Sequence, residues 1–334
     1  MKYIMIWPYG WFDTYMYRDL TANHIVVPLN VNKPYSSRFI NFLHRVHCSY
    51  KLNRMVKLPY KDIWYHSLYK SLATEIDDSA CIIFDTGSLS YLSLHALEKI
   101  KNITNNIKMV LIVVDSLHGS SAHIPYVLPK ILGFNWDLIL SYDQHDCDEF
   151  GFDYMGQTIY SRLNDVKPSD AQSDIYFVGR NKAGRNQDVL KLYEYLHAAR
   201  IKVNFDLVDT KKNNRKSKYH NAPGVHLHDS NIPYEDVISN VLSTNCILEI
   251  VAPGQKVQTA RYYEAVCYNK KLLTNNIGFS ELPFYNPDYI HYFNRIEDID
   301  LEWLQDQTPV EYHYNNEFSP IHLIDMINEK LHLS

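Results

Sequence analysis

Glycine is scarce in this sequence, with 11 residues in a chain of 334. No GxGxxG or GK[ST] motif occurs, so the glycine-rich phosphate loops of dehydrogenases and P-loop NTPases are not predicted. No stretch approaches 18 apolar residues, the length that a membrane-spanning helix needs. The chain opens on a strand-like run that Pro8 interrupts, which is too short for a signal peptide. These absences together favour a cytoplasmic protein.

Cysteine and positive charge are also limited. The five cysteines are scattered and form no CxxC pair, so neither a disulfide framework nor a zinc site is predicted. The 33 Lys and Arg residues are outnumbered by 38 Asp and Glu residues, and the net charge of −5 argues against nucleic acid as a partner. Tyrosine, by contrast, is frequent at 27 residues. Tyrosines can line a carbohydrate site, although the base composition of the gene explains such a count equally well.

Apolar strand-like segments alternate with amphipathic helical patterns along the chain, and this alternation predicts a parallel α/β fold. Strands are expected at 3–7, 24–29, 80–84, 109–114 and 137–141, and again at 174–178, 203–208, 246–251 and 271–274. The polar segment 167–174 contains a proline and separates the two series, as an interdomain linker does. We therefore expect two Rossmann-like domains, 1–167 and 174–315, followed by a helical segment at 316–334.

One helix of the first half has a marked apolar side. It is expected at 37–48, with Arg38 and Arg45 as its basic residues. The apolar residues on one side of this helix are Phe39, Ile40, Phe42, Leu43 and Val46.

The stretch 246–276 organises the second half. Its strand ends near Pro253 and Gly254, a polar loop containing Gln255 follows, and Thr259 then stands where a helix N-cap belongs. The N-terminus of that helix would point N–H groups at an anion above the sheet. Arg261 and Glu264 lie three residues apart on the helix, so one face presents a cation and a hydrogen-bond acceptor. This pair suits a phosphate and a sugar or ribose hydroxyl.

This strand, the Arg-aromatic-aromatic-Glu-Ala helix and the strand that follows resemble the donor half of GT-B glycosyltransferases, especially bacterial enzymes of capsular or surface polysaccharide synthesis. The resemblance implies that Glu264 contacts a sugar nucleotide, with UDP the favoured donor base. It also implies a donor domain in the second half, an acceptor domain in the first, a reaction in the cleft between them, and a last helix that crosses back to the first domain. The sequence departs from the commonest two-glutamate pattern at Lys256, eight residues before Glu264.

A second basic segment follows the strand that opens the second half. Gly179 is expected to let the backbone turn there, and Arg180, Lys182 and Arg185 place three cations within six residues. Cations fixed beside a departing diphosphate would stabilise the charge that grows on it as the glycosidic bond breaks. A solvated surface loop is the alternative interpretation. Together with Gln255, Thr259, Arg261 and Glu264, these residues form the predicted donor site.

The first half must present the acceptor and a catalytic base. Ligands of open α/β sheets bind beyond the carboxyl ends of the strands. Asp13, Asp85, Asp115 and His118 all follow predicted strands, and we take Asp13, Asp115 and His118 as the catalytic candidates. An aspartate at a strand end can equally cap the next helix, so each candidate also has a structural interpretation.

Two DxD pairs raise the question of a metal. Asp146 and Asp148 precede an acidic helix start, and Asp298 and Asp300 lie in a late acidic turn. Short acidic pairs arise often by chance, so we expect no metal and no other cofactor.

The sequence as a whole predicts a metal-independent glycosyltransferase that moves a sugar from a nucleotide donor to a saccharide or lipid-linked saccharide. A lipid-linked acceptor would bring the protein to the inner face of a membrane as a peripheral contact. Two alternatives stay open. One is a GT-A-like transferase that binds metal through a DxD pair, and the other is a non-catalytic partner that binds a sugar nucleotide or glycan within a synthase complex.

Overall fold

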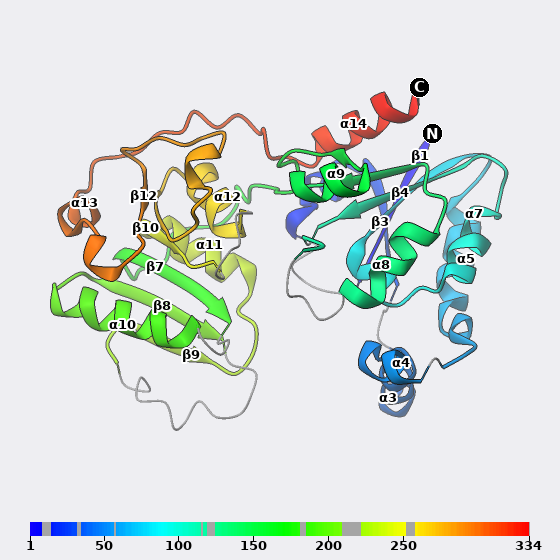
Figure 1. The fold of residues 1–334 in the computed structure, drawn as a ribbon, viewed down its shortest axis with the longest axis horizontal. Helices are drawn as coiled ribbons and strands as arrows, with labels where there is room; N and C mark the ends of the chain where they lie inside the picture. The colour runs from blue at the N-terminus through cyan, green and yellow to red at the C-terminus, as the bar shows by residue number, and fades with distance from the viewer. Residues whose placement is uncertain are drawn as a thin grey trace. The chain divides into compact units, whose positions relative to one another are not determined.

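The computed structural model describes residues 1–8, 15–31, 35–56, 58–114, 116–118, 124–180, 185–208, 222–251 and 258–333. The chain folds as two compact units, residues 1–161 together with 317–334, and residues 162–316. Each unit is built on one six-stranded parallel sheet with helices on both faces (Figure 1). Among these described residues, no helix is both long and apolar enough to cross a membrane.

The sheet of the first unit has the strand order β2-β1-β3-β4-β5-β6. Its strands alternate with helices in the sequence, as the periodicity predicts, and all five pairings are parallel. The strands are β1 (Lys2–Trp7), β2 (Val26–Asn30), β3 (Ala80–Asp85), β4 (Ile107–Val113), β5 (Leu138–Ser141) and β6 (Asp153–Tyr154).

Alternate residues of these strands face two different helical layers. On one face, Ile4, Ile82 and Phe84 join a continuous core with α5, α7 and α8. On the other face lies the C-terminal helix α14, where the Tyr3 hydroxyl donates to Asn328. The helices of this unit are α2 (Arg18–Ala22), α3 (Arg38–His47), α4 (Tyr50–Met55), η1 (Lys61–Tyr65), α5 (His66–Glu75), α6 (Thr86–Leu89), α7 (Leu94–Lys101), α8 (Ile124–Gly133), α9 (Gln144–Phe150) and α14 (Ile321–Leu331).

The helix α14 is part of the first unit although it ends the chain. Its apolar residues Leu323, Ile324 and Ile327 are buried. Just before it, the Ser319 hydroxyl donates to Asp19 at 2.6 Å. The last segment of the chain therefore completes the packing of the domain that the first segment begins. The assignment of the two units to acceptor and donor stays a prediction.

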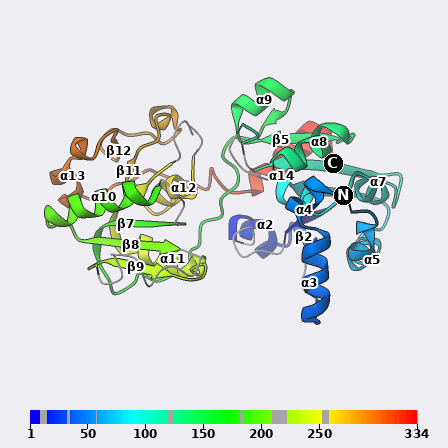
Figure 2. The same cartoon turned by 60° about the horizontal axis from the view of Figure 1, so that its bottom comes forward.

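The sheet of the second unit has the strand order β12-β11-β10-β7-β8-β9, again with every pairing parallel. Figure 2 shows β7, β8 and β9 side by side at one end of this sheet. The strands are β7 (Ser173–Arg180), β8 (Val203–Val208), β9 (Val225–His228), β10 (Thr244–Glu249), β11 (Lys271–Thr274) and β12 (Ile290–Tyr292). The helices are α10 (Arg185–Ala198), α11 (Tyr234–Leu242), α12 (Ala260–Cys267), η3 (Phe279–Glu281), η4 (Ile296–Asp298) and α13 (Leu301–Gln305).

The two faces of this second sheet differ in polarity. Phe177, Phe205 and Leu248 pack with α10 in an apolar core. The neighbouring residues in each strand point the opposite way, toward α11 and α12, because side chains alternate along a strand. Tyr176, Asp206 and Glu249 lie on that second face, and all three are buried. Buried polar groups need partners, and their contacts form the candidate site below.

Gly179 has a different role from the expected turn after the strand. Strand β7 continues through Arg180, so Gly179 lies within it. A Cβ atom at Gly179 would approach the Cζ atom of Phe177 to 2.7 Å. Glycine therefore fits here because the Phe177 ring occupies the space of a side chain.

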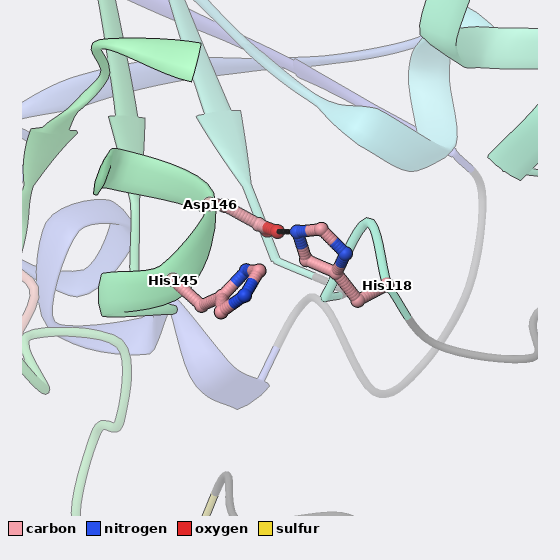
Figure 3. A group of neighbouring side chains, drawn as sticks. All are labelled: His118, His145 and Asp146. Atoms are coloured by element: carbon pink, nitrogen blue, oxygen red, sulfur yellow. Dashed lines mark ion pairs between the residues drawn. The ribbon is translucent and has the colours of Figure 1, made fainter. Parts of the chain in front are cut away.

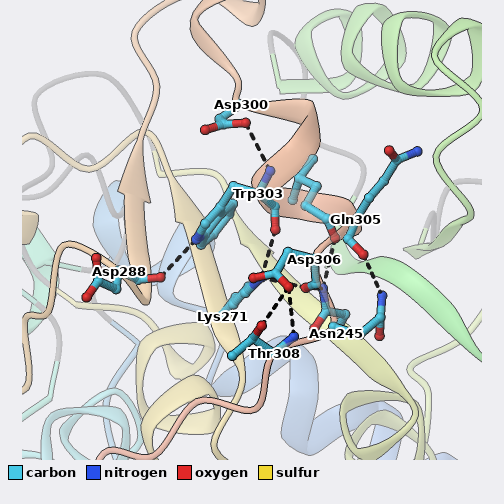
Figure 4. Close-up of polar contacts among 10 residues, drawn as sticks. Asn245, Lys271, Asp288, Asp300, Trp303, Gln305, Asp306 and Thr308 are labelled. Atoms are coloured by element: carbon cyan, nitrogen blue, oxygen red, sulfur yellow. Dashed lines mark hydrogen bonds and ion pairs between the residues drawn. The ribbon is translucent and has the colours of Figure 1, made fainter.

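A buried lysine at the start of β11 holds α13 against the second sheet (Figure 4). The Nζ atom of Lys271 donates to the carbonyl oxygens of Trp303 at 2.7 Å and Asp306 at 2.6 Å. Asn245 donates to the same Asp306 carbonyl at 2.8 Å. The Lys271 side chain is 2% exposed, so its charge depends on these oxygens in place of water.

Replacing Lys271 with methionine should keep the apolar stem but remove the lysine's hydrogen bond to the Trp303 carbonyl and leave the Asp306 carbonyl with Asn245 alone. We expect the free energy of unfolding to fall by about 3 kcal/mol, which urea denaturation would measure. The control is Lys191→Met on α10, where the side chain is exposed and the change should stay within about 0.5 kcal/mol. Equal stability of the two variants would contradict a structural role for Lys271.

Candidate functional site

The helix α12 begins where the sequence predicts. Thr259 is its N-cap, and the Thr259 hydroxyl accepts from the backbone N–H of Arg261 at 3.2 Å. At the other end Asn269 adopts a positive φ of 52°, a conformation that asparagine tolerates better than most residues. Both ends of the helix are thus set by local sequence, which fixes the direction of Arg261 and Glu264.

Glu264 lies at the centre of a buried polar cluster. Its side chain is fully buried, and its Oε1 atom accepts from the Tyr234 hydroxyl at 2.9 Å and from the Arg261 guanidinium. Its Oε2 atom is buried and has no hydrogen-bond partner among the described residues. Burial raises the pKa of Glu264 to about 7, against the opposing effects of Arg261 and Tyr234. The face of α12 that carries Glu264 is therefore buried in the protein interior.

A second carboxylate, Glu249, ends strand β10 close by. Its Oε1 atom accepts from the hydroxyl of Thr259 at 2.6 Å, and its Oε2 atom accepts from the hydroxyl of Thr274 at 2.6 Å. Burial raises the pKa of Glu249, while Thr259 and Thr274 oppose the shift. Glu249 thereby joins the carboxyl end of β10 to the first residue of the α12 turn and to β11.

A third acidic residue, Asp206 on β8, extends the cluster. It accepts from the Tyr176 hydroxyl at 2.9 Å and from Asn240 of α11 at 3.3 Å, and it contacts Nε2 of His228 at 2.7 Å. Burial raises the pKa of Tyr176 well above its usual range, and Asp206 adds to the shift. Two carboxylates, Glu264 and Glu249, thus lie near Arg261, a composition that favours hydroxyl groups as ligands over a bare phosphate.

The structure places only some of the predicted donor residues. Thr259, Arg261 and Glu264 come together as described. Arg180 has an exposed side chain at the end of β7, where it donates to Asn231 at 3.4 Å. Arg185 begins α10, and its side chain is outside the described ones. Lys182 and Gln255 lie outside the described residues.

In the first unit, His118, on the loop after β4, forms a cluster with residues of α9 (Figure 3). Its Nε2 atom lies 3.4 Å from the Asp146 carboxylate and 3.2 Å from that of Glu149. The ring of His145 stands edge-on to it, with the ring centres 4.0 Å apart. Asp146 is fully buried and accepts from the backbone N–H of Leu117 at 3.0 Å.

This cluster can act in two ways. Carboxylates beside Nε2 favour the tautomer that carries its proton on that nitrogen, which leaves Nδ1 as the basic atom and suits a general base. Burial raises the pKa of Asp146, while the Leu117 N–H, His118 and His145 oppose the shift. Alternatively, candidate ligand atoms of His118, His145 and Asp146 lie within 4.8 Å of one another, and two imidazoles with a carboxylate suit a transition metal.

Neither DxD pair converges as metal ligands would. Asp146 is buried, whereas Asp148 is exposed and accepts from Gln144 at 2.9 Å. Asp300 caps α13 by accepting from the backbone N–H of Trp303 at 2.9 Å. Asp298 accepts from the backbone N–H of Arg295 at 2.9 Å. These local hydrogen bonds account for the acidic residues of both pairs.

The other acidic residues that follow predicted strands are Asp13, Asp115 and Asp85. Asp13 and Asp115 lie outside the described residues. Asp85 is the N-cap of α6 and accepts from the backbone N–H of Ser88 at 2.7 Å. Its position at the end of β3 is thus explained by capping, the structural interpretation.

Sequence reasoning missed Tyr234, Glu249, Asp206 and Tyr176. Each is separated by many residues from the groups it contacts, so no local spacing links them. One signal was present for Glu249 and Asp206, since an acidic residue inside an apolar strand must have buried partners.

The feature that this chain shares with known proteins is its fold. No protein-family model matches the sequence, and no curated protein matches it. Among solved structures, the chain is similar to "OtsA apo structure", with a TM-score of 0.55, 10% identity and coverage of 99% of each chain. It is also similar to "alpha-glucosyltransferase (AGT) in complex with UDP", with a TM-score of 0.54 and 13% identity over 98% of this chain and 100% of that one. The chain therefore has a GT-B-like fold of two Rossmann-like α/β domains, which confirms the fold class predicted from sequence.

Proposed function

We propose that this protein is a glycosyltransferase that takes a sugar from a nucleotide diphosphate, with UDP as the favoured nucleotide. The GT-B-like fold supports transfer chemistry, since one solved structure of similar fold is an alpha-glucosyltransferase in complex with UDP. The acceptor is a saccharide or lipid-linked saccharide of cell-surface polysaccharide synthesis. This acceptor would bring the protein to the inner face of a membrane.

The observation that carries the proposal is the Oε2 atom of Glu264, which none of the described residues contacts by a hydrogen bond. An unpartnered carboxylate oxygen in the interior is costly, yet Oε2 has no partner among the described residues. A ribose or sugar hydroxyl would supply the missing donor, and a hydrogen bond to a carboxylate is stronger than one to a neutral acceptor. Arg261 is held by the other oxygen of the same carboxylate, which positions it at the start of α12.

The diphosphate would be bound by the more exposed cations. Arg180 ends β7 at the carboxyl edge of the second sheet, the edge where ligands of open α/β sheets bind. Lys182 and Arg185 follow it directly in the sequence. In this assignment the cationic groups neutralise the leaving diphosphate, and the carboxylate of Glu264 recognises a hydroxyl.

His118 is the proposed base, and Asp146 is a positioning residue that orients its ring. The proposal requires no metal, although the cluster of His118, His145 and Asp146 makes a metal-dependent transferase the competing activity. A non-catalytic sugar-nucleotide-binding protein is the other alternative.

A thermal-shift panel of nucleotides and sugar nucleotides in the presence of EDTA tests this proposal. We expect one UDP-sugar to raise the melting temperature, because a ligand at 100 times its Kd stabilises the folded state by about 2.7 kcal/mol. Arg180→Ala should reduce the shift, and Lys191→Ala, an exposed cation on α10, is the matched control. A shift that appears only with added manganese or zinc would favour the metal-dependent alternative. Binding without transfer to any acceptor would favour the non-catalytic one.

A further inference from the structure

Helix α3 of the first unit has its apolar side turned outward. Phe39, Phe42, Leu43 and Val46 follow the i, i+3, i+4, i+7 spacing that usually packs a helix against a core. In this protein these side chains are 67%, 58%, 41% and 41% exposed. Ile40 beside them is 39% exposed. We refer to these five residues as the α3 surface.

Polar and aromatic contacts hold α3 in this orientation. His44, on the inner side, is 7% exposed and its ring lies against those of Tyr35, Trp64 and Tyr91. Asn41 accepts from the backbone N–H of Tyr35 at 2.7 Å. Rolling the helix to bury its apolar stripe would break these contacts, so the outward direction of the α3 surface is built into the fold.

The segments after α3 add further exposed apolar groups. Met55, Val56, Tyr60 and Ile63 are 84%, 57%, 81% and 65% exposed. They are connected to α3 through its C-terminal end, where His47 contacts the Pro59 carbonyl at 2.8 Å. Figure 2 shows α3 projecting from the first unit. Single exposed apolar residues are ordinary, but a gathering of this kind marks a binding surface.

The charge around the α3 surface identifies what it binds. The sequence has no acidic residue between Asp19 and Asp62, although the chain as a whole carries a net charge of −5. On α3 itself, Arg38 and Arg45 are exposed and, because they are seven residues apart, both lie along the same side of the apolar stripe. The basic residues of this interval are Lys33, Arg38, Arg45, Lys51, Arg54, Lys57 and Lys61. Apolar side chains beside cations, with no acid in the interval, match an anionic lipid surface.

We propose that α3 lies on the surface of an anionic membrane, with the α3 surface in the acyl boundary and Arg38 and Arg45 at the headgroup phosphates. This inference extends the proposed function and rests on it, because the lipid-linked acceptor proposed there is the reason for this protein to lie near a membrane. The position of α3 agrees with that role. It follows the carboxyl end of β2, and His118 follows the carboxyl end of the parallel strand β4 in the same sheet.

Vesicle co-sedimentation of the full chain, without donor or acceptor, tests the membrane contact separately from transfer. We expect the protein to bind vesicles of phosphatidylcholine with phosphatidylglycerol, and to bind vesicles of phosphatidylcholine alone weakly. Phe39→Ser/Phe42→Ser should lower the partition coefficient about tenfold or more, because two rings no longer enter the bilayer. Arg38→Glu/Arg45→Glu should remove the preference for anionic vesicles and its sensitivity to salt.

Matched controls lie elsewhere on the protein. Leu132→Ser/Ile277→Ser removes two apolar side chains that are 54% and 56% exposed and should leave vesicle binding unchanged. Lys191→Glu/Lys202→Glu reverses two exposed cations outside α3 and is the matched control for Arg38→Glu/Arg45→Glu. Vesicle binding that survives the Phe39/Phe42 change would overturn the proposal, as would wild-type protein that ignores anionic vesicles. A wild-type dimer in lipid-free buffer that the Phe39/Phe42 change converts to monomer would overturn it too, in favour of a second copy as the occupant.

Discussion

Glu264→Gln is expected to weaken binding of the UDP-sugar about 10- to 100-fold, because a hydrogen bond to a charged group contributes about 1.5–3 kcal/mol. Glutamine keeps the size of the side chain and an oxygen for Tyr234, so the fold should survive. It replaces one carboxylate oxygen with an N–H group, which cannot accept from a ligand hydroxyl. Isothermal titration calorimetry would measure the loss. Glu302→Gln, at an exposed position of α13, is the control.

The pH dependence gives the same substitution a second readout. The pKa of Glu264 is raised from 4.5 to about 7 in the folded protein, so folding favours its protonated form. The resulting stability is fully present below pH 4.5 and is lost as pH rises through about 7. Across this window, the unfolding free energy of the wild type should fall by about 3 kcal/mol relative to that of Glu264→Gln.

Ligand binding should change in the opposite direction. The ionised carboxylate is the better acceptor for a ligand hydroxyl, so affinity for the UDP-sugar should rise as pH passes about 7. Glu264→Gln should abolish that rise. An affinity that Glu264→Gln leaves intact at every pH would place the donor elsewhere and remove the observation on which the proposed function rests.

His118→Ala is expected to lower kcat about 10²- to 10⁴-fold, the usual contribution of a general base. The Kd of the UDP-sugar should be unchanged, because the proposed donor residues are all in the second unit. Asp146→Asn should keep the fold but lower kcat less and shift the pH–rate profile, since it changes the group that orients the imidazole. Single-turnover transfer would separate these effects from product release.

His145→Ala is the matched control in the same cluster. Its ring neighbours that of His118 but is more exposed, at 68% against 38%. If His118 acts alone as the base, His145→Ala should have little effect. Comparable losses in both variants, together with inactivation by a chelator and recovery on adding zinc, would instead identify a metal site.

Much of the second unit could be predicted from local sequence. The strand at 271–274 and the helix after Thr259 are where the sequence predicts them, because a short apolar run and an N-cap both act within a few residues. The alternation of these elements also predicted the parallel sheets. Such signals depend on the backbone and its nearest side chains, which is why they survive in a single sequence.

Contacts between distant elements could not be predicted in this way. Nothing near Glu264 in the sequence indicates that Tyr234 donates to it, and nothing near His118 indicates Asp146. The helix at 37–48 shows the same limit, because periodicity identifies an apolar side without saying which way it faces. In α3 the inner side is decided by His44 and Asn41, whose partners lie on other elements.

The position of α14 has a consequence for the order in which the protein can fold during synthesis. The second unit is one continuous segment, 162–316, and is complete once that segment has left the ribosome. The first unit needs residues 1–161 and also 317–334, so it must wait until 317–334 have been made. Until then, the sheet face that Leu323 and Ile327 cover is open to water. We therefore expect a nascent chain lacking α14 to be the form of this protein that chaperones recognise and that aggregates.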